Sequence, residues 1–86
     1  MQELEKFRKE IDEIDREILT QLAKRFEVVK KVWEYKKLHN MPPLQKKRWE
    51  EVLKSRRDFA KKLELWEDFI EKIWNEIHKY AIDLEK

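Results

Sequence analysis

The sequence has 86 residues, enough for one small domain with a modest core, and 47% of them are charged. The charges nearly cancel, at a net +2, which argues against a dedicated nucleic-acid binder with its concentrated basic excess. Cysteine and glycine are both absent, so disulfides, thiolate metal sites and glycine-rich phosphate-binding loops are excluded.

The first predicted element is a long helix. From Leu4 onward, apolar residues recur every three or four positions, which is the helical period. The helix must end before Pro42 and Pro43, because proline lacks the N–H and constrains the residue before it. We therefore expect a helix over about residues 3–38, on the order of 50 Å long at about 1.5 Å per residue. Such a rod is too long for a compact monomer of this size, so we expect its packing partner to be another chain.

Two further helices follow the proline loop. The second is expected to start near Leu44, and the third carries an apolar face around Trp74. The stretch between them, KKLELWED, contains neither glycine nor proline. We place a bend at about residues 64–66, with one continuous helix as the alternative. With no repeat and no linker, the pattern predicts an all-α chain of three helices forming a single domain over residues 1–86.

Two cations interrupt the apolar stripe of the first helix, which reads Ile11, Ile14, Ile18, Leu22, Arg25, Val29, Val32, Lys36. Arg25 and Lys36 are eleven residues apart, so both project from nearly the same side, about 16 Å apart along the axis. Their stems could pack at the edge of the stripe with the charged heads in water. Alternatively they bind a small polyanion, with Arg8 brought across by an antiparallel partner helix. Arginine suits carboxylates because its planar fork donates two parallel hydrogen bonds.

Other kinds of site have little support. The histidines, His39 and His78, form no H-E-x-x-H motif, and Glu76 lies two residues from His78 instead of the three of a helical Glu-x-x-His pair. We therefore expect no metal site. Ser55 is the only serine and has no base near it in the sequence, which argues against nucleophilic catalysis. The aromatic residues lie at helical spacings, which favours packing over base stacking.

Targeting signals are also missing from the pattern. No apolar run approaches the roughly 20 residues of a membrane span. The first ten residues, MQELEKFRKE, lack the apolar centre of a signal peptide. We expect a cytoplasmic protein with neither a membrane nor a nucleic acid as its partner.

The segment FRKEIDEIDREILTQLAKRFEVVKKVWEYKK resembles the first helix of the all-α chorismate mutases. That pattern is an arginine, I-D-x-I-D three residues on, an apolar pair, L-x-x-R, and a lysine eleven residues later. It is matched without a gap by Arg8, Ile11, Asp12, Ile14, Asp15, Ile18, Leu19, Leu22, Arg25 and Lys36. MPPLQKKRWEEVLKSRRDFA is similar to the loop and second helix of that family, and FIEKIWNEIHKYAIDLE to its third helix.

The resemblance implies an intertwined helical homodimer with two active sites, each sharing residues of both chains. The implied reaction converts chorismate to prephenate for phenylalanine and tyrosine biosynthesis, and it needs no cofactor. Arg25 would hold a substrate carboxylate, Lys36 would reach the ether oxygen and a carboxylate, and Glu85 would contact the ether oxygen.

Four more residues complete the site that the resemblance implies. Arg8 from the partner chain would bind the second carboxylate, with Arg48 in support, and Gln45 and Ala81 would also line the substrate. Three positions depart from the family pattern: Trp49 and Gln45 stand for acidic residues, and Glu64 for a glycine. Gln45 or Glu50 could replace the missing contact to the substrate hydroxyl. Two alternatives stay open, an isochorismate-pyruvate lyase of the same fold and a non-catalytic helical dimerisation or regulatory module.

Overall fold

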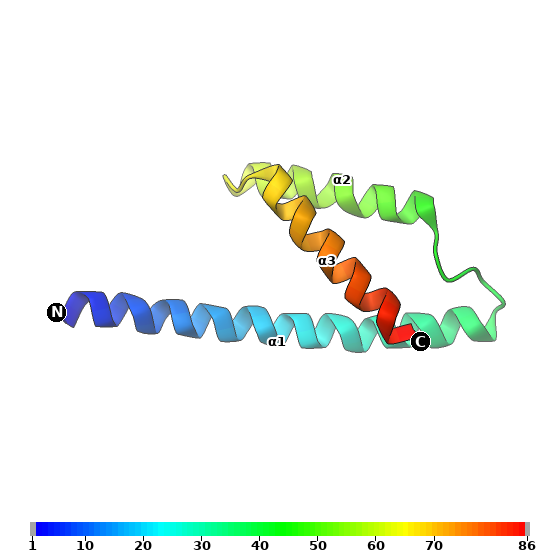
Figure 1. The fold of residues 1–86 in the computed structure, drawn as a ribbon, viewed down its shortest axis with the longest axis horizontal. Coiled ribbons are helices and arrows are strands. Elements are labelled where there is room, and N and C mark those ends of the chain that lie inside the picture. Colours follow the sequence, from blue (N-terminus) through cyan, green and yellow to red (C-terminus); the bar gives the residue numbers. More distant parts are fainter. Residues whose placement is uncertain (1, 86) are drawn as a thin grey trace. The chain divides into compact units, whose positions relative to one another are not determined.

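The structure, a computed structural model, describes residues 2–85 as three helices (Figure 1). Helix α1 runs over Gln2–Leu38, α2 over Lys46–Lys62 and α3 over Glu67–Glu85. The prediction of an all-α, three-helix chain is confirmed for these residues. The alternative of one continuous helix in place of α2 and α3 is wrong. No described helix is both long enough and apolar enough to pass through a membrane.

The chain divides into two compact units, one ending at Val32 and the other beginning at Trp33, and each is described by itself. The first unit is the N-terminal part of α1. The second contains the C-terminal end of α1 together with α2 and α3, which pack against each other as a helical hairpin (Figure 1). The single domain expected over residues 1–86 stays a prediction.

Helix α1 ends in a hydrogen-bonded turn. The Met41 N–H donates to the Lys36 carbonyl oxygen at 2.9 Å, and the Asn40 N–H donates to the Lys37 carbonyl oxygen at 3.4 Å. This is the Schellman pattern, which places one residue in the left-handed conformation. Asn40 takes that role with φ 53°. The prolines that follow prevent the helix from continuing, so the predicted end near residue 38 is confirmed.

The same pattern ends α2 and makes the bend into α3. The Leu65 N–H donates to the Ala60 carbonyl oxygen at 2.9 Å, and the Glu64 N–H donates to the Lys61 carbonyl oxygen at 3.1 Å. Glu64 occupies the left-handed position with φ 61°. Glycine is the usual residue there, because a Cβ atom disfavours that conformation. The bend expected at residues 64–66 is therefore present. Because Glu64 has a Cβ atom, its left-handed conformation costs conformational free energy that glycine would not.

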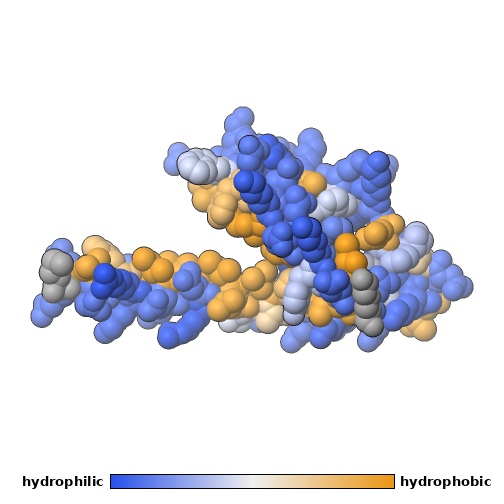
Figure 2. All heavy atoms as spheres, in the orientation of Figure 1, coloured by the Kyte–Doolittle hydropathy of each residue, from blue (hydrophilic) through white to orange (hydrophobic). Residues whose placement is uncertain are grey.

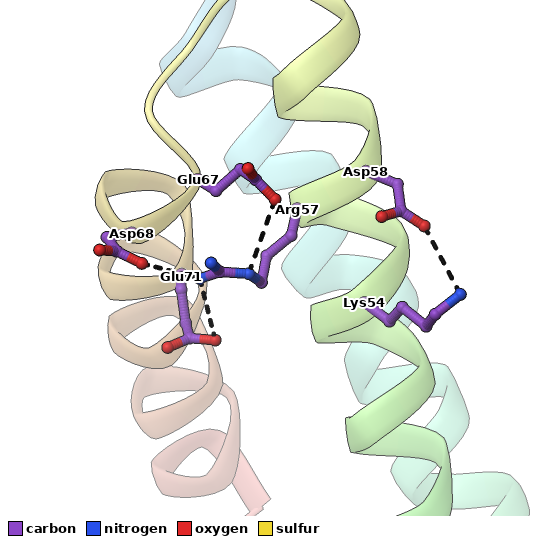
Figure 3. Close-up of polar contacts among 6 residues, drawn as sticks. All are labelled: Lys54, Arg57, Asp58, Glu67, Asp68 and Glu71. Atoms are coloured by element: carbon purple, nitrogen blue, oxygen red, sulfur yellow. Dashed lines mark hydrogen bonds and ion pairs between the residues drawn. The ribbon is translucent and has the colours of Figure 1, made fainter.

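An ion-pair cluster joins the two helices next to this bend (Figure 3). On α2, the Arg57 Nη1 atom lies 3.1 Å from Asp68 Oδ1 and 3.5 Å from Glu71 Oε1, and its Nε atom lies 3.9 Å from Glu67 Oε1. The hydrogen bond to Asp68 is the main cause of the raised pKa of Arg57; burial opposes it, and the nearby carboxylate charges add to it. A raised pKa keeps the guanidinium charged until strongly alkaline pH, so the link persists throughout the neutral range.

Burial differs sharply between the units. Among residues 2–85, the buried apolar residues all belong to the second unit: Trp33, Val52, Ala60, Ile70, Ile77 and Ala81. In the first unit the apolar row of α1 is exposed, with orange atoms along one side of the helix in Figure 2. Its members are Leu4, Phe7, Ile11, Ile14 and Ile18. An exposed apolar row of this length is typical of an interaction surface, and the homodimer stays a prediction.

Candidate active site

The second unit contains five of the predicted site residues, which are Lys36, Gln45, Arg48, Ala81 and Glu85. Contacts in this unit join the last turns of α1 to those of α3, and the first turn of α2 to α3. Trp33 ties α1 to α3, because its indole N–H donates to the Ala81 carbonyl oxygen at 3.1 Å in a buried contact. The Lys36 ammonium lies over the Trp33 ring, with Nζ 4.7 Å from a ring centroid. Lys36 is thereby placed beside the last turns of α3, and Glu85 follows one turn after Ala81.

Lys36 is half-buried and held by a specific contact. Its Nζ atom donates a hydrogen bond to the Pro43 carbonyl oxygen at 2.9 Å. An ammonium has three N–H donors, so this bond leaves two for other acceptors. The cation–π contact with Trp33 restricts the flexible lysine stem. The geometry is that of a fixed cation able to approach a negatively charged oxygen.

The N-terminus of α2 adds positive charge to the same unit. Gln45 is the N-cap residue, and its side chain makes no capping hydrogen bond. The first turn contains Lys46, Lys47 and Arg48, with no acidic residue. Backbone N–H groups and the positive end of the helix dipole favour an anion at such a terminus. Gln45 and Arg48 are both exposed and are therefore accessible to a carboxylate ligand.

An aromatic contact joins α2 to α3 in this part of the second unit. Trp49 on α2 stacks on His78 of α3, with ring centroids 3.8 Å apart and an interplanar angle of 14°. The stack joins the first turn of α2 to α3 one turn before Ala81. Ala81 is buried and Glu85 is half-buried.

The two remaining predicted residues lie in the first unit. Arg8 is exposed and pairs with Glu5, with Nη1 3.0 Å from Oε1. An exposed pair of this kind contributes little, typically about 0–1 kcal/mol, so Arg8 can exchange it for another carboxylate. Arg25 is half-buried. The convergence of Arg8 and Arg25 with Lys36 on one ligand stays a prediction.

The comparisons with known proteins bear on the whole of this region. The family model for chorismate mutase type II matches residues 7–86. The chain belongs to the chorismate mutase type II family. It is also 37% identical over 73 residues to the T-protein of Haemophilus influenzae, in a match covering 85% of this chain and 19% of that protein. The chain thus spans about a fifth of the length of this relative. No solved structure matches it.

Membership in the chorismate mutase family confirms the resemblance read from the sequence. The family match includes all seven predicted site residues: Arg8, Arg25, Lys36, Gln45, Arg48, Ala81 and Glu85. Their roles in this chain are not tested by that match. No group of three histidine, aspartate and glutamate side chains within residues 2–85 is placed to hold a metal ion.

Sequence reasoning missed three residues that shape the chorismate mutase-like site. Trp33 supports Lys36, Pro43 accepts its hydrogen bond, and His78 stacks on Trp49. The first had a usable signal, since Trp33 precedes Lys36 by three residues and so lies next to it on the helix. The other two contacts join residues from separate elements, which helical periodicity does not pair.

Proposed function

We propose that the chain catalyses the rearrangement of chorismate to prephenate, as a homodimer in which each site combines residues of both chains. The observation that carries this proposal is the family match, which covers every predicted site residue from Arg8 to Glu85. The second unit supports it, because it holds Lys36 at one end of a hairpin beside an anion-favouring helix terminus. The pathway we infer is phenylalanine and tyrosine biosynthesis.

The proposed mechanism relies on charge and positioning. Chorismate must fold so that its enolpyruvyl arm lies over the ring, and clamping both carboxylates favours that conformer. We assign one carboxylate to Arg25 and the other to Arg8 of the second copy, with Arg48 supporting the binding. These guanidinium groups match carboxylates in shape as well as charge.

Lys36 and Glu85 act on the bond that breaks. As the ether C–O bond lengthens and the new C–C bond forms, negative charge grows on the ether oxygen. A fixed ammonium there binds the transition state more strongly than the ground state. Glu85 donates to the same oxygen when its carboxyl group is protonated. All atoms of the substrate stay in the product, so these residues need no cofactor.

The decisive test is direct. Purified protein is given chorismate, and in parallel isochorismate, while the loss of substrate absorbance and the products are followed. We expect prephenate from chorismate and no pyruvate from isochorismate. The matched control is Lys36→Met, which keeps an unbranched stem without the charge and should be inactive. Pyruvate from isochorismate alone would select the lyase, and no product from either would select a non-catalytic module.

A further inference from the structure

An aromatic pair joins α2 to α3 within the second unit, and the proposed mechanism gives it no role. Trp49 stacks on His78 with ring centroids 3.8 Å apart and an interplanar angle of 14°. Both side chains are half-buried. Nearly parallel rings at this distance restrict each other's rotation, so the stack holds the imidazole of His78 in a defined orientation.

The two stacked residues share helix faces with residues assigned to the substrate. On α3, His78 precedes Ala81 by three residues and Glu85 by seven, so the three lie on one face of the helix. On α2, the Trp49 N–H donates to the Gln45 carbonyl oxygen at 3.1 Å, which places these two residues one turn apart on the same side. The stack therefore connects the faces of α2 and α3 that contain predicted substrate contacts.

This face of α3 is also connected to the cation of the proposed mechanism. The Ala81 carbonyl oxygen accepts the buried hydrogen bond of the Trp33 indole at 3.1 Å. The Lys36 ammonium lies over that indole, 4.7 Å from a ring centroid. His78 is one helical turn from Ala81, about 4.5 Å along the helix axis. This spacing suits a small ring compound that contacts both Lys36 and the imidazole.

The substrate of the proposed function has one polar group that the mechanism leaves unassigned. Its two carboxylates are assigned to arginines, and its ether oxygen to Lys36 and Glu85. The remaining group is the hydroxyl on the ring carbon next to the ether. A hydroxyl both donates and accepts hydrogen bonds. An imidazole donates through an N–H and, in its neutral form, accepts through its other ring nitrogen, so either nitrogen of His78 suits this group.

Two other side chains near the start of α2 could reach the hydroxyl, those of Gln45 and Glu50. Both are exposed, and the Gln45 side chain makes no capping hydrogen bond. An exposed, flexible side chain loses conformational entropy when a ligand orders it. The imidazole of His78 is already ordered by its stack, so it loses less, and the observations favour it over the other two.

We propose that His78 binds the ring hydroxyl of chorismate, held in position by its stack on Trp49, and that the chain thereby selects substrates that carry this hydroxyl. His78 is then a specificity-determining residue, and Trp49 is a positioning residue that acts through it. This inference rests on the proposed function, and it adds a contact for the last polar group of the substrate.

The test pairs a change in the protein with the matching change in the substrate. Steady-state kinetics are measured with chorismate and with a dehydroxy analogue, in which hydrogen replaces the ring hydroxyl. His78→Phe keeps a ring that can stack on Trp49 and removes both nitrogens. It should lower kcat/KM for chorismate roughly tenfold and change kcat/KM for the analogue by less than about twofold, because a contact to the hydroxyl is already lost there.

Two further variants sharpen the measurement. Trp49→Leu removes the stack and should cause a smaller loss that again appears only with chorismate, whereas Trp49→Phe should retain most of the activity. The matched control is His39→Phe. His39 is exposed and lies against another aromatic ring, that of Tyr35, with centroids 4.1 Å apart, and its change should affect neither substrate.

Several outcomes would overturn the inference while leaving the proposed function intact. These are equal losses with both substrates for His78→Phe, an unchanged rate with chorismate, or a hydroxyl-dependent loss for Gln45→Leu or Glu50→Leu in its place. Wild-type protein that converts neither substrate would overturn both proposals. If His78→Phe fails to fold, the imidazole nitrogen signals of His78 are followed by NMR in the wild-type protein. They should shift when prephenate, which retains the hydroxyl, is added, and signals that do not move would contradict the contact.

Discussion

Along the first unit, the apolar side chains of α1 from Leu4 to Ile18 keep between 38% and 56% of their surface exposed. In the α2–α3 hairpin, Val52, Ala60 and Ile70 are at most 8% exposed. Both regions are amphipathic helices with the same three-four spacing of apolar residues. The spacing of apolar residues therefore determines which face of a helix is apolar. Whether that face is buried within the same chain depends on the loop that follows the helix and on the helix that this loop brings alongside. A short bend gives α2 its partner, whereas the N-terminal part of α1 continues into the rest of the same helix without a bend.

The largest expected effect tests whether both units serve one reaction. Arg25→Ala changes the first unit, and Lys36→Ala changes the second. Each should lower kcat/KM by on the order of 10² or more, because in the proposed mechanism each removes a cation that stabilises the transition state. Lys36→Ala also removes the hydrogen bond to the Pro43 carbonyl oxygen, so we expect it to lower folding stability by about 0.5–1.5 kcal/mol. Steady-state kinetics and urea unfolding of each variant provide the measurements.

Lys36→Met separates charge from packing in this experiment. If Lys36→Met kept full activity while Lys36→Ala unfolded the protein, Lys36 would contribute through the packing of its aliphatic side chain and not through its charge. Loss of activity for Lys36→Ala alone, with Arg25→Ala fully active, would restrict the site to the second unit.

Subunit mixing sharpens the comparison by asking which copy supplies Arg8. Arg8→Ala and Arg25→Ala chains should each be nearly inactive alone. In a heterodimer of the two, one of the two sites keeps both arginines. Random exchange should therefore restore about one quarter of the wild-type activity in a twofold-symmetric dimer. Exchange is verified with differently tagged chains, and verified exchange without recovered activity would place Arg8 outside the site.

A smaller effect, on folding stability, is expected at the C-terminal ends of α1 and α2. Both ends form the Schellman pattern, with Asn40 in the left-handed position at one and Glu64 at the other. Glu64→Gly should stabilise the protein by roughly 0.5–1 kcal/mol, because the left-handed penalty of a residue with a Cβ exceeds the entropy cost of glycine. Asn40→Gly is the matched control, with a gain of at most a few tenths of a kcal/mol, since asparagine tolerates φ 53°. Urea unfolding at one chain concentration measures both changes. Equal gains would show that Glu64 is not strained.

The fold followed from local signals that the sequence contains. The period of the apolar residues gave three helices, and Pro42 and Pro43 gave the end of the first. The bend at Glu64 was harder, because its hydrogen-bond pattern uses a residue that seldom adopts a left-handed conformation. The sequence interpretation nevertheless placed a bend at residues 64–66, with one continuous helix as the alternative, and the structure has the bend there.

The candidate site was predictable where residues share one helix. Arg25 and Lys36 interrupt one stripe, so spacing alone singled them out. The contacts that position Lys36 were not predicted. Pro43, which accepts its hydrogen bond, lies in a loop, and Ala81, which accepts the hydrogen bond of Trp33, lies on a helix far along the sequence. Such contacts depend on how helices pack, and periodicity carries no information about which side chains then meet. Placing Arg8 requires still more, since the role proposed for it depends on a second chain.

The smallest expected effect concerns Glu85, in the last turn of α3, and it tests the second unit alone. An ionised carboxylate repels the negative charge that grows on the ether oxygen, whereas a protonated one donates a hydrogen bond to it. We therefore expect kcat/KM of the wild-type protein to fall as pH rises. Glu85→Gln should remove that dependence, because an amide donates at every pH, and should change the rate at neutral pH by no more than a few-fold, since helix ends fray. Two pH–rate profiles between about pH 4.5 and 8.5 make the comparison. Glu85 is half-buried in the last turn of α3, and that turn has no basic residue. Superimposable profiles for the two proteins would mean that Glu85 does not touch the ether oxygen, and Lys36 would then be the only group of this unit assigned to the breaking bond.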